Sequence, residues 1–188
     1  MAKNEVENSK KEVLTDFETK KKEVLTAICK VLVTKNQRYG NSALSPTKIF
    51  YKGNKSDAIL IRLNDKMSRV QNSQELRKND LYDIVGYLFL YRIGYNEVYA
   101  AKDGADFKTY LGDLYNVYMK SIVESTGNGL NIFTKANPYL MAADVAICKL
   151  SELTPDTAEM VAQVDELIKA IVLYFIDQNI TNFDDLID

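Results

Sequence analysis

The chain has 188 residues, of which 46% are hydrophobic and 27% charged, and its net charge is −2 at pH 7. A chain of this length can bury a substantial core without disulfides or metals, and its composition is that of a globular protein. Because the net charge is slightly negative, we expect no general binding to DNA or RNA. A local basic pocket for a small nucleotide is still compatible with this balance.

Histidine is absent from the sequence, and this absence removes several kinds of enzyme chemistry. Histidine-based acid–base catalysis, histidine metal ligands and a Ser-His-Asp triad cannot be assembled. The groups left for catalysis are carboxylates, lysine, tyrosine, cysteine or a metal bound through oxygen. Cys29 and Cys148 lie far apart in apolar helical patterns, so we expect buried free thiols rather than a disulfide.

The spacing of apolar residues predicts an all-α fold, a helical bundle of about six helices that forms a single domain over residues 1–188. The first predicted helix covers 4–34, and residues 1–20 are expected to form an exposed helical arm because lysines interrupt their apolar stripe. No segment of about 18 apolar residues is present, so we expect no membrane association. The other helices are predicted at 55–72, 80–95, 104–124, 138–150 and from Thr154 onward, with a short turn in 181–188.

A long loop is predicted between the first two helices, at residues 35–54. Gly40, Pro46 and Gly53 interrupt the helical pattern there. A connection of this length is usually either functional or disordered. Its polar side chains include Tyr39, Asn41, Ser42 and Lys48.

The helix after this loop carries four charged side chains on one face, at positions i, i+3, i+4 and i+7. These are Arg62, Asp65, Lys66 and Arg69. The three cations can bind phosphate oxygens, and Asp65 can order an arginine or accept a hydrogen bond from a sugar or base. The same face lies opposite the apolar side of the helix, so the pattern also fits a plain solvent-exposed face.

Asp80 and Asp83 stand three residues apart at the start of the third predicted helix. They can hold Mg²⁺ through oxygen, or they can stabilise the first turn of the helix. Tyr87 and Tyr91 follow at steps of four and can either stack on a base or pack in the core. Gly86 indicates a close helix crossing or a ligand that approaches the backbone.

The glycine-containing segment 125–129 lacks the Gly-Lys-Ser/Thr ending of a phosphate-binding loop and follows a helix. We therefore predict a turn that ends the preceding helix, and no phosphate site.

Three blocks of sequence carry a resemblance when they are taken together. They are Lys35-Asn36-x-x-Tyr39-Gly40-Asn41-Ser42, Ile-Arg-Leu-x-Asp65-Lys66-x-Ser68-Arg69 and Asp80-x-x-Asp83-x-x-Gly86-Tyr87. In order and spacing they resemble the nucleotide modification associated domain family, found mostly in bacteriophages and prophages. The resemblance covers about residues 24–97, whereas the C-terminal helical part, 98–188, resembles no family. It implies a nucleotide-related role in phage biology.

The predicted layout is also distantly similar to that of the all-α nucleoside triphosphate pyrophosphohydrolases. Those enzymes use four carboxylates, on two facing helices, to hold Mg²⁺ against the phosphates of the substrate. Asp80 and Asp83 can stand for one half of that set. The facing helix has Arg62 where those enzymes have a glutamate, which favours direct phosphate binding over metal-mediated binding.

The leading hypothesis is a nucleotide-binding protein of phage type, without a cofactor and without chemistry of its own. The basic helix face would hold phosphate, while the loop around Tyr39–Ser42 would contact base or ribose. Such a protein could act in anti-defence by sequestering a nucleotide immune signal, or it could serve nucleotide modification. The predicted ligand-binding residues are Tyr39, Asn41, Ser42, Lys48, Arg62, Asp65, Lys66, Arg69, Asp83 and Tyr87.

Two alternatives stay open at this point. The first is a Mg²⁺-dependent nucleotide pyrophosphohydrolase or related phosphohydrolase, with Asp65, Asp80 and Asp83 as metal ligands. The second is a helical protein–protein interaction module whose N-terminal arm docks a partner. Under all three hypotheses we expect a homo-oligomer in the cytoplasm of a bacterial host cell.

Overall fold

The computed structural model describes residues 2–73, 75–123 and 137–187, with side chains from residue 16 onward. Throughout these ranges the regular structure is helical and contains no strand, which confirms the predicted all-α fold. The elements are α1 (Ala2–Tyr39), α2 (Lys55–Gln71), α3 (Lys78–Tyr99), α4 (Phe107–Ser121), α5 (Pro138–Leu150), α6 (Ala158–Asp177) and the 3-10 turn η1 (Asp184–Leu186).

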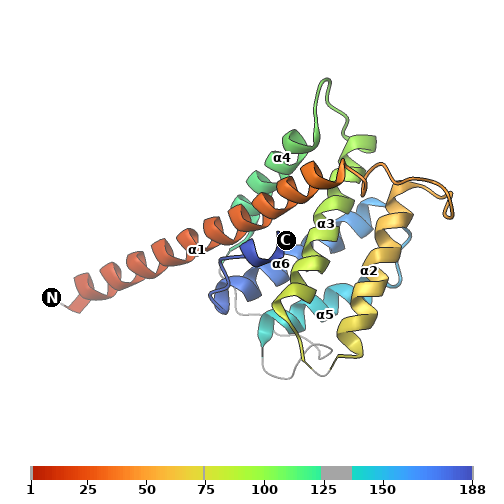
Figure 1. Ribbon diagram of the computed structural model, residues 1–188. Helices are drawn as coiled ribbons and strands as arrows, with labels where there is room; N and C mark the ends of the chain where they lie inside the picture. The colour runs from red at the N-terminus through yellow and green to blue at the C-terminus, as the bar shows by residue number, and fades with distance from the viewer. Residues whose placement is uncertain (1, 74, 124–136, 188) are drawn as a thin grey trace.

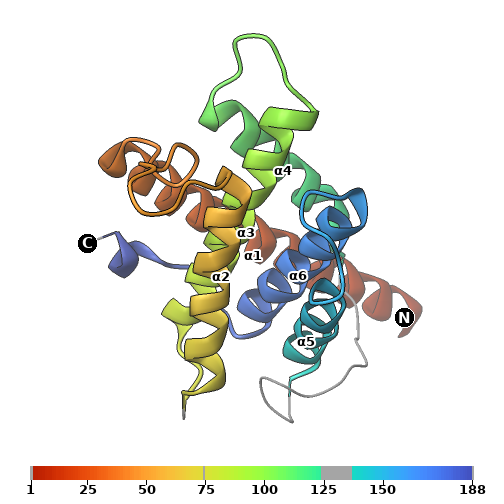
Figure 2. The same cartoon turned by 90° about the vertical axis from the view of Figure 1, so that its right-hand side faces the viewer.

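The third helix, α3, lies at the centre of the bundle (Figure 1). It is buried on nearly all sides, as its continuous apolar sequence predicts, because α2, α4 and α6 pack around it. α2 runs antiparallel to α3, and α5 packs along α6 (Figure 2). None of the helices in the described ranges is both long enough and apolar enough to cross a membrane.

The first helix, α1, is one continuous helix of 38 residues, and its N-terminal end extends beyond the other helices (Figure 1). Packing against the bundle is already established at Phe17, which is 9% exposed and lies within the predicted arm. Lys21 is buried one turn later, where its ammonium group donates to the carbonyl oxygen of Ile122 at 3.0 Å. The C-terminal half of α1 therefore belongs to the core, together with α4 and α6.

The end of α1 differs from the prediction and matters for the site. The helix continues through Tyr39 rather than ending at residue 34, so Lys35 and Asn36 are helical. It ends where Gly40 and Asn41 both take a φ of 59°. The Asn41 N–H then donates to the carbonyl oxygen of Asn36 at 3.2 Å, which is the Schellman arrangement of a helix C-terminus.

Two predicted helix starts are also wrong. α6 does not begin at Thr154, because Asp156 has a φ of 59° and the hydroxyl of Thr157 caps the helix instead. α4 does not begin at residue 104, because Gly104 has a φ of 70° and Asp106 closes a capping box two residues later. In both places a left-handed residue keeps the preceding segment out of the helix.

The C-terminal segment after α6 returns across α1 and α3. Phe183 is fully buried, and its ring centroid lies 5.1 Å from that of Tyr82 and 5.0 Å from that of Phe175. The expected short turn in this segment is η1. Two ion pairs hold it at the surface: Lys30–Asp184 at 2.7 Å and Lys78–Asp185 at 2.8 Å.

Candidate functional site

A pocket of about 360 Å³ lies between the C-terminal end of α1, the segment that follows it, α2 and α3. Its volume is in the range of small-molecule sites. Because three helices contribute to it, the packing of α1 and α2 against α3 sets its shape. The lining residues are Leu32, Lys35, Asn36, Tyr39, Asn41, Ser42, Ala43, Arg62, Tyr82, Asp83, Gly86, Tyr87 and Leu90.

The wall that α1 contributes exists because the helix runs to Tyr39. Leu32, Lys35, Asn36 and Tyr39 are spaced i, i+3, i+4 and i+7, so the helix presents them on one face. Lys35 and Asn36 were not among the predicted ligand-binding residues, although they open the first of the three sequence blocks. Continuing the helical pattern past residue 34 would have found them.

The pocket gathers six of the ten predicted ligand-binding residues. Arg62 comes from α2, whereas Asp83 and Tyr87 come from α3. The other three lie at the end of α1 and just after it. The six are Tyr39, Asn41, Ser42, Arg62, Asp83 and Tyr87.

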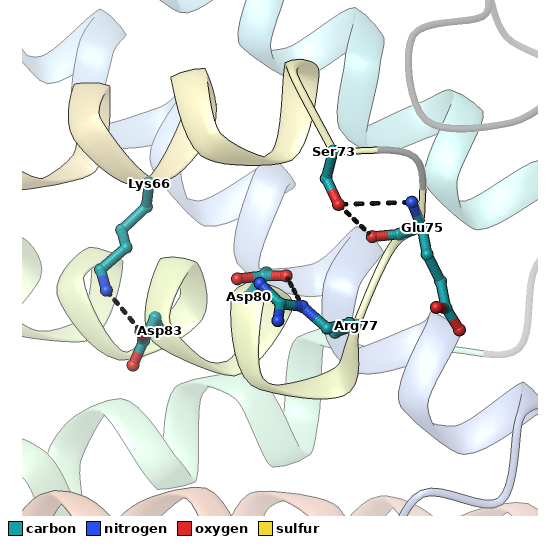
Figure 3. A network of polar contacts seen from close by, with 6 residues as sticks. All are labelled: Lys66, Ser73, Glu75, Arg77, Asp80 and Asp83. Atoms are coloured by element: carbon teal, nitrogen blue, oxygen red, sulfur yellow. Dashed lines mark hydrogen bonds and ion pairs between the residues drawn. The ribbon is translucent and has the colours of Figure 1, made fainter.

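The remaining four predicted residues do not line the pocket. Lys66 is close to it, since its ammonium group donates to Oδ2 of Asp83 at 2.6 Å (Figure 3). Lys48, Asp65 and Arg69 are exposed elsewhere. Arg69 follows Arg62 by two helical turns, about 10 Å along the axis of α2, and of the four residues in the charged stripe Arg62 lines the pocket.

The charges around the pocket are predominantly positive. Arg62 is exposed and has no ion-pair partner among the described residues. Lys35 likewise has none there, and its Nζ lies 5.4 Å from the centroid of the Tyr82 ring. Asp83 is the carboxylate of the lining set, and Lys66 offsets its charge. An anion entering the pocket would therefore meet uncompensated cations.

The carboxylates proposed as Mg²⁺ ligands are not brought together. Asp83 pairs with Lys66 from α2, and Asp80 pairs at 3.1 Å with Arg77, the N-cap residue of α3 (Figure 3). Asp65 is exposed on α2. No group of three potential metal-ligating side chains is found within the described ranges. The alternative in which Asp65, Asp80 and Asp83 share a metal therefore lacks its geometry, because each of the two α3 carboxylates faces a different cation.

Of the two tyrosines predicted on α3, Tyr87 lines the pocket and Tyr91 does not. Tyr91 is fully buried, and its hydroxyl accepts a hydrogen bond from the Asp156 N–H at 2.9 Å. Burial raises the pKa of Tyr91 to about 12. Tyr91 is thus a core residue, one of the two interpretations that the sequence left open.

Tyr82 is a lining residue that the sequence did not indicate. It is 2% exposed, and its buried hydroxyl has no hydrogen-bond partner in the described part of the chain. Burial, and then the neighbouring Asp83 carboxylate, raise the pKa of the Tyr82 hydroxyl far above its ordinary value. A neutral hydroxyl without a partner is costly unless a ligand or water satisfies it.

Gly86 lines the pocket on α3, between the side chains of Leu32 and Tyr82. A Cβ atom at this position would lie 3.7 Å from Cδ2 of Leu32 and 3.8 Å from Cε1 of Tyr82, which are ordinary contact distances. The glycine is therefore not required by a clash between helices. Gly86 does line the pocket, and the approach of a ligand to the backbone of α3 stays a prediction.

The remaining sequence candidates contribute nothing to this site. Cys29 is a half-buried free thiol, and burial raises its pKa from 9.0 to about 12, so it is a poor nucleophile. Cys148 is also free, but it is exposed near the end of α5 beside the exposed Lys149, which corrects the expected burial. Segment 125–129 lies outside the described residues.

All three sequence blocks that carry the family resemblance supply lining residues to this one pocket. In comparisons with protein-family models, curated proteins and solved structures, the chain matches none of them. The resemblance to the nucleotide modification associated domain family therefore stays a prediction.

Proposed function

We propose that this protein binds a small nucleotide in the pocket between α1, α2 and α3 and performs no reaction on it. The observation that carries the proposal is the meeting of Arg62 on α2 with the polar residues around Asn41 in one cavity of about 360 Å³. An unpaired arginine suits a phosphate group, since its planar fork can donate two hydrogen bonds to phosphate oxygens.

The other pocket residues suit the remaining parts of a nucleotide. Tyr39 and Tyr87 provide aromatic surface against which a base can stack. Asn41 and Ser42 offer hydrogen bonds to a base or ribose. The ion pair between Lys66 and Asp83 keeps this carboxylate from repelling a phosphate.

Binding is favoured over hydrolysis because the carboxylates that would hold Mg²⁺ already have cationic partners. Asp83 pairs with Lys66 and Asp80 with Arg77. In the setting that the family resemblance suggests, such a binding protein would sequester a nucleotide immune signal or deliver a nucleotide to a modification pathway.

Isothermal titration calorimetry without added metal tests the proposal. The titrants are nucleoside monophosphates, nucleoside diphosphates and cyclic nucleotides. We expect at least one of them to bind, and we expect Arg62→Ala to weaken that binding about tenfold or more, because a hydrogen bond to a charged group is worth about 1.5–3 kcal/mol.

Arg69→Ala is the matched control, because Arg69 lies on the same helix, is exposed and stays outside the pocket. It should leave the affinity unchanged. Failure of every titrant to bind would reject the proposal. Release of phosphate or pyrophosphate on addition of Mg²⁺ would support the hydrolase alternative in its place.

A further inference from the structure

The end of α1 places two asparagine side chains together at one wall of the pocket. Gly40 and Asn41, both with a φ of 59°, reverse the chain directly after Tyr39. Nδ2 of Asn36 then donates to Oδ1 of Asn41 at 2.8 Å. Both residues line the pocket. Asn41 takes the left-handed conformation that asparagine adopts more readily than most residues other than glycine.

The hydrogen bond between the two amides leaves other polar groups of both side chains without a partner among the described residues. An asparagine amide has two N–H donors and one carbonyl acceptor. The contact consumes one N–H of Asn36 and occupies the carbonyl of Asn41. In the described part of the chain, the side-chain carbonyl of Asn36 and the side-chain NH₂ of Asn41 have no further partner. Within the described ranges the pair therefore offers a free carbonyl acceptor on Asn36 and free N–H donors on both residues, and the contact between them holds the two amides in place.

An adjacent donor and acceptor are complementary to the hydrogen-bonding edge of a nucleobase. Each base presents both kinds of group on that edge, and proteins read unstacked bases by hydrogen bonds combined with stacking on aromatic rings. The rings of Tyr39 and Tyr87 line the same pocket. A phosphate, in contrast, only accepts hydrogen bonds, so it could use the N–H groups of the pair but not the Asn36 carbonyl.

The charges on the walls of the pocket also indicate which wall suits the base of a nucleotide and which suits its phosphate. The C-terminal end of a helix carries a partial negative charge, which offsets part of the Lys35 charge on the α1 wall and makes this wall less favourable for an anion than its cation alone would. The uncompensated guanidinium of Arg62 belongs to the α2 wall. A nucleotide is therefore best accommodated with its base at the end of α1 and its phosphate at Arg62.

Building on the proposed function, we infer that the pocket reads the base of its nucleotide through the Asn36–Asn41 amide pair. The ligand class is then a base-containing nucleotide, and a sugar phosphate that lacks a base is not a ligand. Asn36 and Asn41 are the residues that determine this specificity.

The test compares AMP, GMP, CMP and UMP with ribose 5-phosphate by calorimetric titration of the full chain. We expect at least one of the four nucleotides to bind, and we expect ribose 5-phosphate to bind at least tenfold more weakly. Asn41→Gly should reduce nucleotide affinity about tenfold, because it removes the amide while suiting the left-handed backbone. Asn36→Ala should act similarly, and the double variant should lose little more than either single variant.

Asn179→Gly is the matched control, since Asn179 has a φ of 53° and lies after α6, outside the pocket. It should leave nucleotide affinity unchanged. Equal binding of ribose 5-phosphate and nucleotides, with Asn41→Gly unchanged, would overturn this inference while leaving the proposed function in place. Absence of binding by all five compounds and by the wider nucleotide panel would overturn both.

Discussion

At position 86, alanine would favour the stability of helix α3, whereas glycine adds no side chain to the lining of the pocket. Gly86 lies in the interior of α3, where glycine is less favourable than alanine by about 1 kcal/mol. Nothing within 3.4 Å would obstruct a methyl group there. Alanine, the better helix former, is thus sterically allowed, and its methyl group would contact Leu32 and Tyr82 in the lining of the pocket.

We expect Gly86→Ala to raise the free energy of unfolding by up to about 1 kcal/mol and to weaken nucleotide binding. Urea denaturation measures the first effect and calorimetric titration the second. Gly112→Ala is the control, because Gly112 is exposed in α4 and has open space around it. It should stabilise the protein similarly without changing affinity. Unchanged affinity in Gly86→Ala would show that the ligand does not approach the backbone of α3.

Three helices are joined by one polar cluster away from the pocket. Oδ1 of Asp165 on α6 accepts from Nε of Arg92 on α3 at 2.7 Å and from the hydroxyl of Tyr118 on α4 at 2.6 Å. The side chains of Arg92 and Asp165 are 11% and 21% exposed. The cluster therefore fixes the orientation of α4 and α6 on α3, the helix that carries one wall of the pocket.

Asp165→Ala should lower the free energy of unfolding by about 2–4 kcal/mol, because it leaves a largely buried guanidinium and a buried hydroxyl without their acceptor. Urea denaturation checks this value. Asp113→Ala removes the exposed ion pair with Lys102 and should cost less than about 1 kcal/mol. Similar losses in the two variants would mean that the cluster does not join the helices in the way described.

The helices themselves could be predicted because periodicity survives in a single sequence. α5 was predicted with both of its bounds, since Pro138 marks its start and its apolar pattern ends at Leu150. Two helix starts were missed where a left-handed residue keeps the preceding segment out of the helix, at Gly104 and at Asp156. Nothing in the residue type alone signals that choice, because it depends on hydrogen bonds formed in the folded chain.

The candidate site was predictable within single helices and not between them. Spacing on α2 and α3 is enough to select Arg62, Asp83 and Tyr87 as candidates. Which cation meets which carboxylate depends on how the two helices pack. The pairing of Lys66 with Asp83 could therefore not be read from spacing, and neither could the distance of Arg69 from the pocket.

For the molecule as a whole, buried neutral acids make stability depend on alkaline pH. Burial raises the pKa of Cys29 from 9.0 to about 12 and that of Tyr91 from 10.0 to about 12. Below pH 9.0 these groups are neutral in both states, so their contribution to folding is complete. As the pH rises toward 12, the unfolded chain loses these protons first, and the free energy of unfolding falls.

We expect the free energy of unfolding to fall between about pH 9 and 12 with a slope of up to about 1.4 kcal/mol per pH unit for each such group. Urea denaturation at a series of pH values measures the slope. Cys29→Ala should flatten the first part of the curve, where the thiol of the unfolded chain ionises before its tyrosines. Cys148→Ala should not, because Cys148 is exposed. A steep slope that survives in Cys29→Ala would assign the effect to other groups.

The C-terminal segment has a practical consequence for immobilising or labelling the protein. Phe183 packs against Tyr82, a lining residue, and the backbone carbonyl of Ile187 accepts a hydrogen bond from Arg38 at the end of α1. A biosensor linkage or affinity tag attached beyond Ile187 would pull on the segment that supports the pocket. The projecting end of α1 is the better attachment point, because it lies at the opposite end of α1 from the residues that line the pocket (Figure 1).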